Sequence, residues 1–476
     1  MGRRGSVDGL IGVSGMAPKF NGVYPPSMPG PTDARGTEDP LPFPGDLTGR
    51  RAVVMGLGRF GGGEAVARHL RRLGAEVVVT DLRPAEELER SITGLAETGV
   101  TFRLGAHRVE DFTAADLVVV NPAVPHPWDN PFLREARAGG ARLLTEIRLA
   151  IGDHPAERVI GITGSAGKST TAAMVQHALL RIRPDLRSRL GGNIGGSLLD
   201  DPPADDSTLV LELSSFMLHW IAGDAGEPED RFTPGVALVT NIAPNHLDWH
   251  RSLEHYAASK QAILTGSPAC PAPRPVDASR CPWRADVLSE LELAVPGSHN
   301  RDNAIDAIAT IIEHLTLVDG ERADPRATAS ACAAALRDFP GLPHRLEFVG
   351  EHRGVRFFND SKSTTPGATG LAVESMSSTR RTHLIAGGYD KGSDLEPVAR
   401  LARDLAGLYG IGATEAAICE HGGEACGTLA KAFERAVASA GEGDVVLLSP
   451  GCASWDQFTD FEVRGRTFRE LVERLD

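Results

Sequence analysis

Residues 159–171 read Val-Ile-Gly-Ile-Thr-Gly-Ser-Ala-Gly-Lys-Ser-Thr-Thr. The stretch begins with β-branched residues typical of a buried strand, continues into a glycine-rich turn, and ends in a segment with helical spacing. In such a strand–turn–helix unit, backbone N–H groups and the positive end of the helix bind phosphate. Lys168 would reach the β- and γ-phosphates of a nucleotide, and the Ser169 hydroxyl would bind Mg²⁺. The strict pattern requires glycine at Ile162, so an ordinary glycine-rich turn with a solvated lysine is the alternative.

The composition is that of a globular protein. The chain has 476 residues, enough for two to four domains, with 41% hydrophobic and 24% charged residues. A net charge of −14 argues against a nucleic-acid partner, which requires a basic surface. No apolar run is long enough to span a membrane. The six cysteines are scattered without a C-x-x-C pair, which predicts a reducing cytoplasm and no cysteine metal site.

Residues 1–45 are rich in glycine and proline and show no helical or strand period, so we expect a disordered tail. Next, residues 51–55 predict a strand, followed by Gly-Leu-Gly-Arg-Phe-Gly at 56–61, a helix, and a strand at 77–80 that ends at Asp81. This is the complete dinucleotide-binding fingerprint, with an acidic residue placed to bind a ribose hydroxyl. Taken alone it indicates an NAD-binding domain, but the same geometry fits any pyrophosphate–ribose ligand, including a UDP-sugar.

Strands and helices also alternate through the rest of the chain. Apolar runs at 209–213 and 236–240 predict parallel strands buried on both faces, with Glu212 and Asn241 near their carboxyl ends. Residues 266–283, rich in proline and cysteine, predict a loop or a surface excursion. A third segment beginning near His344 has predicted strands at 355–359, 383–386 and 445–448. The predicted fold is α/β in three domains after the tail: a Rossmann-like domain at 46–156, a phosphate-loop domain with a central parallel sheet at 157–343, and a Rossmann-like domain at 344–476.

The loop Thr163–Ser169 resembles the ATP loop of the Mur ligases, whose pattern is T-G-x-x-G-K-[ST]. This pattern does not require a glycine at the position of Ile162. These enzymes use ATP to add amino acids to peptidoglycan precursors. Further family motifs follow in order: Gly192–Gly195, Glu212–Phe216, Asn241 with His246 and Asp248, Gly297–Asn300, His344-Arg345, Asn359–Lys362 and Gly387–Lys391. The run Ser449–Phe458 resembles the MurD-type members, which add glutamate to UDP-N-acetylmuramoyl-L-alanine. The resemblance covers roughly residues 50–475.

The resemblance implies a cytoplasmic, monomeric cell-wall ligase that uses ATP and Mg²⁺. ATP would phosphorylate the substrate carboxylate, and the amine of glutamate would attack the acyl phosphate. The implied ATP-binding residues are Gly164, Ser165, Ala166, Gly167, Lys168, Ser169, Thr170, Asn300, Asn303, Arg345 and Asp360. The implied catalytic residues are Lys168, Glu212, His246 and Lys260. The implied metal-site residues are Ser169, Glu212, His246 and, when carbamylated, Lys260.

Lys260 matches a lysine that this family carries as a carbamate. Carbamylation needs a neutral amine, whereas a free lysine titrates near pH ~10.4, so the site must lower its pKa by burial. An exposed helical lysine is the alternative. For Glu212 the alternative is a strand-end glutamate paired with a lysine, and for His246 it is a structural histidine.

Two substrate pockets are implied by the same resemblance. The UDP-sugar would contact Arg59, Phe60, Asp81, Arg83, Asn121, Pro122, Asn193 and His246, and glutamate would contact Lys362, Lys391, Ser454, Trp455 and Phe461. Two lysines suit an amino acid with two carboxylates. Two residues depart from the family pattern: Asn245 replaces an acidic residue, and Trp455 replaces a smaller aliphatic one. Trp455 leaves D- versus L-glutamate open.

Several other functions stay open at this point. Within the ligases, the chain could use L-glutamate, or it could be another Mur-type or folylpolyglutamate-type enzyme. An NAD-dependent oxidoreductase would leave the Lys168 loop unexplained. A non-catalytic nucleotide-binding module would leave Lys168, Glu212, His246 and Lys260 without a purpose.

Overall fold

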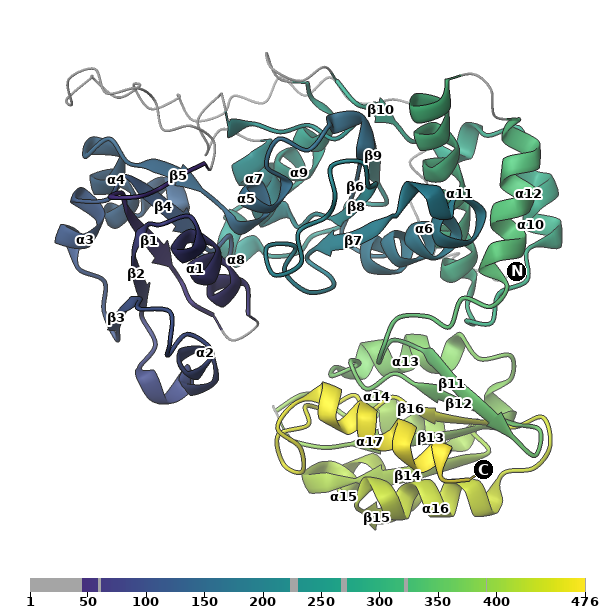
Figure 1. Cartoon of the computed structure of the whole chain (residues 1–476). Helices are drawn as coiled ribbons and strands as arrows, with labels where there is room; N and C mark the ends of the chain where they lie inside the picture. Colours follow the sequence, from purple (N-terminus) through teal and green to yellow (C-terminus); the bar gives the residue numbers. More distant parts are fainter. Residues whose placement is uncertain are drawn as a thin grey trace, which may run out of the picture.

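The computed structural model describes residues 45–58, 61–222, 230–266, 272–320, 324–390 and 392–475. The predicted tail, except its last residue, lies outside these ranges, as do Arg59, Phe60 and Lys391. Three α/β units follow one another along the chain, each built on its own sheet (Figure 1). The predicted α/β class is therefore confirmed, while the domain boundaries at 156/157 and 343/344 stay predictions.

The first unit has a five-stranded parallel sheet in the order β3-β2-β1-β4-β5. The strands are β1 (Arg51–Met55), β2 (Glu76–Asp81), β3 (Thr101–Leu104), β4 (Leu117–Val120) and β5 (Arg142–Leu144). The helices are α1 (Gly62–Arg72), α2 (Glu89–Thr93), α3 (Val109–Thr113), α4 (Pro131–Ala138) and α5 (Glu146–Ile151). The strand order reverses direction beside β1, and ligands of such sheets bind at the carboxyl ends of the strands there.

The second unit has a five-stranded parallel sheet in the order β10-β9-β6-β8-β7. Its strands are β6 (Val159–Thr163), β7 (Arg189–Gly192), β8 (Leu209–Glu212), β9 (Val236–Val239) and β10 (Arg274–Pro275). Its helices are α6 (Lys168–Ile182), α7 (Ser215–Ile221), α8 (Leu247–His250), α9 (Leu253–Gln261), α10 (Arg284–Glu290), α11 (Ser298–Asp319) and α12 (Pro325–Leu336). Helices α6, α11 and α12 share one apolar core with β6 and β9.

The segment 266–283 was expected to be a loop or a surface excursion, and the loop alternative is wrong at two of its residues. Arg274 and Pro275 form the short edge strand β10, which pairs with Val236 and Ala237 of β9. Proline has no N–H to donate to a further neighbour, so it suits an edge strand.

The third unit has a six-stranded sheet in the order β11-β12-β16-β13-β14-β15, parallel except for β11. Its strands are β11 (Glu347–His352), β12 (Val355–Asn359), β13 (Thr382–Gly387), β14 (Gly407–Ile411), β15 (Glu424–Gly427) and β16 (Val445–Leu448). Its helices are α13 (Pro366–Glu374), α14 (Glu396–Ala399), α15 (Glu415–Ile418), α16 (Leu429–Ser439) and α17 (Phe461–Glu473). Strands β12 and β16 have the predicted bounds.

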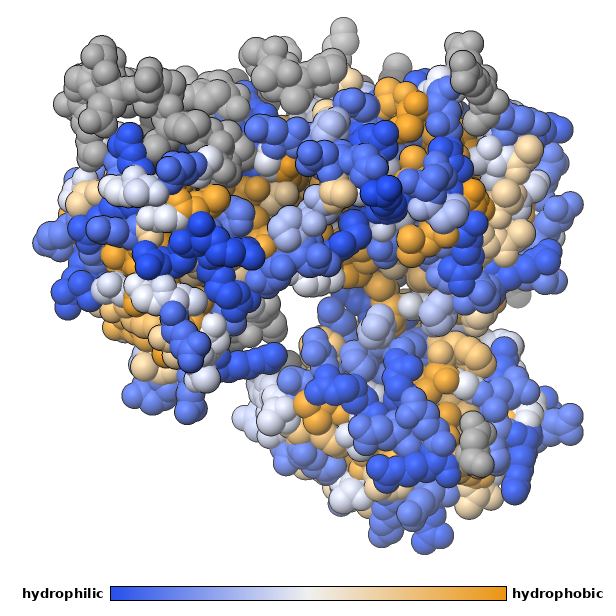
Figure 2. Space-filling model, viewed as in Figure 1, coloured by the Kyte–Doolittle hydropathy of each residue, from blue (hydrophilic) through white to orange (hydrophobic). Residues whose placement is uncertain are grey.

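In the space-filling view, an open gap separates the third unit from the first (Figure 2). Among the described residues, none of the helices is both long and apolar enough to cross a membrane. The cysteines of the described ranges are free thiols, of which Cys332, Cys426 and Cys452 are buried.

Candidate functional site

The phosphate loop joins β6 to α6 and depends on two glycines. Gly164 and Gly167 have φ of 145° and 82°, a region that side chains rarely adopt. A Cβ on Gly164 would collide with the hydroxyl of Thr240, and one on Gly167 would collide with the side-chain amide of Asn303. The loop therefore packs directly against the end of β9 and against α11.

Side chains of the second unit fix the loop in place. Asn241, just beyond β9, accepts a hydrogen bond from the Ala166 N–H at 2.9 Å and donates to the Ala166 carbonyl at 3.0 Å. The Ser165 hydroxyl accepts from the Ala243 N–H at 2.8 Å and lies 2.8 Å from the Tyr256 hydroxyl. Ser165 was predicted to bind ATP, and its hydroxyl is also an anchor of the loop. Tyr256 was not predicted, because nothing near it in the sequence points to the loop.

Glu212 ends β8 as a buried carboxylate that is 1% exposed. Its Oε1 accepts a hydrogen bond from the Asn193 side-chain amide at 3.2 Å. Its Oε2 is buried and has no hydrogen-bond partner among the described residues. A buried carboxylate oxygen without a partner is costly, so this position fits a bound cation.

Lys168 is the first residue of α6, and two charged side chains, Glu212 and Arg345, lie close enough to shift its pKa. Burial lowers the pKa of Lys168, Glu212 opposes that shift, and Arg345 of the third unit adds to it. The ammonium group donates to the Ser165 carbonyl at 3.2 Å. Lys168, Glu212 and Arg345 thus come together although they lie on separate elements.

Lys260, on α9, is 2% exposed. Its Nζ donates to the Thr163 hydroxyl at 3.3 Å and lies 4.9 Å from the centre of the Tyr256 ring. Burial, and next the charge of Lys168, lower the pKa of Lys260 to about 7. The position is therefore not an exposed helical lysine, and a large fraction of its amine is neutral near pH 7.

His246 lies on the loop before α8 and packs on the Phe216 ring, with 4.9 Å between the centroids. Burial is the main cause that lowers the pKa of His246, with Lys260 and Lys168 adding to it. A neutral imidazole of this kind can bind a cation or accept a proton. The side-chain oxygen of Asn245 accepts a hydrogen bond from the His246 N–H at 2.9 Å. The backbone of His246 has a positive φ of 52°, so Asn245 helps to stabilise this turn.

The residues expected at a metal site fit that role chemically. Ser169 is buried in the first turn of α6 and offers a hydroxyl, and Glu212 offers its unpartnered oxygen. Mg²⁺ prefers such oxygen ligands together with phosphate oxygens and water.

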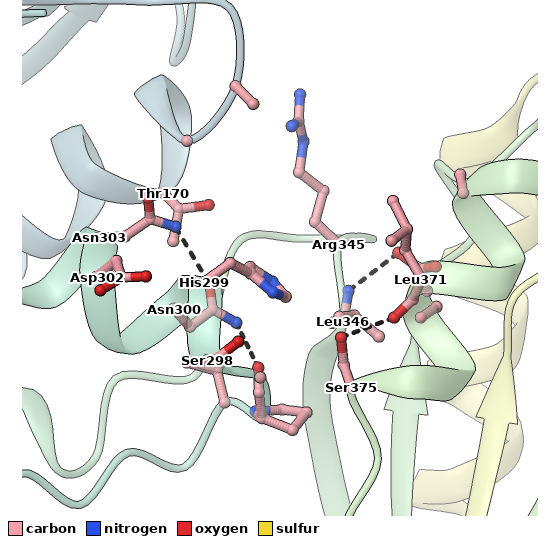
Figure 3. A pocket seen from close by; sticks show the side chains of 18 of the residues that line it. Thr170, Ser298, His299, Asn300, Asp302, Asn303, Arg345, Leu346, Leu371 and Ser375 are labelled. Carbon is pink, nitrogen blue, oxygen red and sulfur yellow. Dashed lines mark hydrogen bonds between the residues drawn. The ribbon is translucent and has the colours of Figure 1, made fainter. Parts of the chain in front are cut away.

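A cleft of about 1540 Å³ lies between the second and third units. Figure 3 shows the side chains of α11 on one side, Arg345 between the units, and residues of α13 on the other side. The predicted ATP-binding residues on its wall are Ala166, Gly167, Thr170, Asn300, Asn303, Arg345 and Asp360. Gly164, Ser165, Lys168 and Ser169 belong to the loop and the first turn of α6 but are not on the cleft wall.

Three of the predicted ATP-binding side chains already make internal hydrogen bonds. Asn300 donates to the Pro296 carbonyl at 2.6 Å and accepts from Asn303 at 3.4 Å. Asp360 is 5% exposed and accepts from the Leu346 N–H at 3.2 Å and the Ser449 hydroxyl at 2.7 Å. Burial raises the pKa of Asp360 to about 6. The carboxylate therefore supports the wall of the cleft.

The residues expected to bind glutamate occupy the edge of the third unit. The Lys362 ammonium lies 5.3 Å from the centre of the Phe461 ring, and burial, followed by Arg345, lowers the pKa of Lys362. Ser454 is 2% exposed, whereas Trp455 is 62% exposed and its ring lies 5.5 Å from that of Tyr389. Lys391 falls outside the described residues.

Arg464 of α17 organises this edge and was not predicted. It is 1% exposed and donates to the Ser361 carbonyl at 2.9 Å and to the carbonyls of Cys452 and Ala453 at 3.1 Å each. Burial lowers its pKa to about 10. Arg464 thus fixes the chain before Lys362 relative to the chain before Ser454. A lone arginine in an amphipathic helix offers no sequence signal for this contact.

The glycine turn of the first unit is held by two of the predicted UDP-sugar residues. Asp81 accepts from the N–H groups of Gly58 at 3.2 Å and Arg83 at 2.9 Å. Asn121 donates to the Gly56 carbonyl at 3.4 Å. The turn and Asn121 follow β1 and β4, and Asp81 ends β2, so they meet at the carboxyl ends of these strands. Pro122 follows Asn121.

This geometry defines an α/β protein of the phosphate-loop class in which two units line the cleft beside the loop. Residues 162–272 match the Mur ligase middle domain, residues 344–452 the Mur ligase, glutamate ligase domain, and residues 50–145 the Mur ligase MurD-like, N-terminal domain. The chain therefore belongs to the Mur ligase family, as its motifs predicted.

Similar curated proteins match over nearly their whole length. UDP-N-acetylmuramoylalanine--D-glutamate ligase of Acidobacterium capsulatum is 36% identical, covering 90% of this chain and 97% of that protein. The protein of the same name from Anaeromyxobacter dehalogenans is 37% identical, covering 90% and 98%. Among solved structures, UDP-N-acetylmuramate-alanine ligase MurC from Thermotoga maritima is 19% identical with a TM-score of 0.49, covering 90% of this chain and 100% of that one.

Proposed function

We propose that this chain is an ATP-dependent, ADP-forming ligase that joins D-glutamate to the alanine carboxylate of UDP-N-acetylmuramoyl-L-alanine. It would thereby act in peptidoglycan precursor synthesis. The observation that carries the proposal is the group of lysines around Glu212: Lys168 and Lys260 come from the second unit, and Lys362 from the third. Relatives named for this reaction are 33–37% identical over 90% of the chain.

The cationic side chains of Lys168 and Arg345 suit the transfer of a charged phosphoryl group. In the first step an alanine carboxylate oxygen bonds to the γ-phosphorus of ATP, and the bond from that phosphorus to ADP breaks. Lys168 and Arg345 would neutralise the phosphate oxygens, since catalysis of this transfer is mostly positioning and charge stabilisation. The product is an acyl phosphate.

In the second step the neutral amine of glutamate attacks the acyl carbon. The C–N bond forms, the C–O bond to phosphate breaks, and the nitrogen releases a proton. Lys362 and Lys391 would bind the two carboxylates of glutamate, with Ser454, Trp455 and Phe461 around them. Closure of the third unit on the second would exclude water from the acyl phosphate.

We also propose that Mg²⁺ is held by Ser169 and Glu212, with His246 and carbamylated Lys260 beside it. The ion would supply positive charge to the phosphate oxygens. The UDP-sugar would bind at the glycine turn of the first unit and extend past Asn193 toward His246. Its proposed contacts in the first unit are Arg59, Phe60, Asp81, Arg83, Asn121 and Pro122. The boundaries 46–156, 157–343 and 344–476 divide these roles.

We further propose that the chain works as a cytoplasmic monomer. The described cysteines are free thiols, which suits a reducing compartment. Nucleotide-linked precursors and ATP are also found there.

The test is phosphate release from ATP and Mg²⁺ in the presence of UDP-N-acetylmuramoyl-L-alanine, with D-glutamate, L-glutamate or no amino acid. We expect release that depends on D-glutamate and that is lost in Lys168→Met. Release with L-glutamate alone would keep the mechanism but change the substrate. No release with either amino acid would contradict the proposal.

A further inference from the structure

The turn that presents Arg345 to the cleft has an uncommon backbone. His344 and Leu346, the residues on either side of Arg345, have φ of 63° and 45°. Residues other than glycine rarely adopt this left-handed region, and a bulky side chain makes it less favourable still. Two such residues in three persist only where the surrounding structure holds them.

Glu347, the first residue of β11, holds one side of this turn. Its Oε2 accepts the His344 N–H at 3.0 Å and the Asn359 side-chain amide at 3.0 Å, and its Oε1 pairs with Arg469 of α17. The residue is 5% exposed. A buried carboxylate that accepts a main-chain N–H makes a strong, charge-assisted hydrogen bond.

The other side of the turn is fastened to the same unit. The Lys362 N–H donates to the His344 carbonyl at 3.0 Å, and the Leu346 N–H donates to Asp360 at 3.2 Å. Both neighbours of Arg345 are thus tied to β12 and the residues that follow it. The Arg345 side chain itself extends from this turn into the cleft (Figure 3).

We propose that Glu347 is a positioning residue that acts on nucleotide through Arg345. Its carboxylate keeps His344 left-handed, and the turn then aims the Arg345 guanidinium toward Lys168 and the phosphate loop. Without the carboxylate, His344 relaxes to negative φ and the direction of the Arg345 side chain changes. The inference rests on the proposed use of the cleft for ATP.

The test measures the dissociation constant of a fluorescent ADP analogue, together with KM for ATP. The variants are Glu347→Ala, Arg345→Ala and the double variant. The matched control is Glu351→Ala, which removes an exposed glutamate of the same strand. We expect Glu347→Ala and Arg345→Ala each to weaken nucleotide binding roughly 10- to 100-fold, as for a lost charge-assisted contact.

The double variant decides whether Glu347 acts through Arg345. We expect it to bind nucleotide within roughly twofold of Arg345→Ala, since residues that act through one another are not additive. The control should stay within roughly twofold of the parent. Effects that multiply, or a Glu347→Ala that binds like the parent, would overturn the proposal.

A substitute variant and the choice of nucleotide binding as the readout keep the outcome interpretable. If Glu347→Ala does not fold by circular dichroism, Glu347→Met carries the same comparison, because it keeps the length of the side chain and removes both oxygen acceptors. Nucleotide binding needs neither glutamate nor the UDP-sugar. A parent protein that binds ADP but forms no amide would therefore contradict the proposed function and leave this inference standing.

Discussion

Lys260 gives the sharpest test of the proposed site, because its burial sets its chemistry. A pKa of about 7 leaves half of its amines neutral at pH 7. An exposed lysine with a pKa near ~10.4 has roughly 4 neutral amines in 10,000 at that pH. The fold therefore supplies on the order of 1,000 times more of the form that attacks CO₂. We predict a carbamate on Lys260.

The sign of the pH dependence follows from the lowered pKa. The neutral fraction of Lys260 rises from about 10% at pH 6 to about 90% at pH 8. When a degassed sample is given back the same concentration of dissolved CO₂ at each pH, activity should therefore recover faster at the higher pH. In the unfolded chain the amine binds its proton up to pH ~10.4, so the buried amine lowers the free energy of unfolding most below pH 7. In CO₂-free buffer below pH 7, Lys260→Met should therefore unfold at a higher temperature than the parent while showing little activity.

The assay is ¹³C NMR of protein equilibrated with ¹³C-bicarbonate at pH 8, alongside ligation rates after degassing. We expect one carbamate signal that is absent in Lys260→Met and present in Lys431→Met, which removes an exposed lysine. Degassing should lower the rate, and bicarbonate should restore it. Full activity with no labelled carbamate would refute the reasoning.

Three further predictions concern the metal site, the loop and the glutamate pocket. Glu212→Gln should raise the Mg²⁺ concentration that gives half-maximal phosphate release at least roughly tenfold, because one of few carboxylates is lost; an unchanged Mg²⁺ titration would place the ion elsewhere. Gly164→Ala should lower the free energy of unfolding by roughly 1–3 kcal/mol, because the new Cβ would collide with Thr240 at a positive φ. Gly367→Ala is the control, since a Cβ there meets open space, and thermal melts compare the two variants. Trp455→Leu should change KM for glutamate and leave KM for ATP and the melting temperature within error, because its ring is exposed.

Local sequence patterns predicted much of the framework. Strands β4, β12 and β16 have the predicted bounds, because each is a short apolar run bounded by polar or turn residues. The phosphate loop at 163–169 was also predicted, because its glycines and Lys168 are adjacent in the chain. Strand β11 was missed: its residues are mostly half-exposed and lack a clear alternation.

The site could be predicted only where family motifs mark it. The resemblance named Lys168, Glu212 and Lys260 as partners, and the structure brings them within electrostatic reach. Tyr256 and Arg464 were not found, since Tyr256 contacts Ser165, 91 residues away, and Arg464 contacts Ser361, 103 residues away along the chain. No local pattern reports a contact over that distance.

The sequence by itself determined the order of three α/β units, the phosphate loop and the identity of the charged groups, because these depend on neighbouring residues. Only the tertiary structure decided how the charged groups behave. The pKa of Lys260 falls because helix α9 is buried beside Lys168, and Arg345 reaches the cleft because Glu347 and Asp360 hold its turn. Burial and the distances between remote segments set the pKa of Lys260 and the position of Arg345, and no single stretch of the chain predicts either.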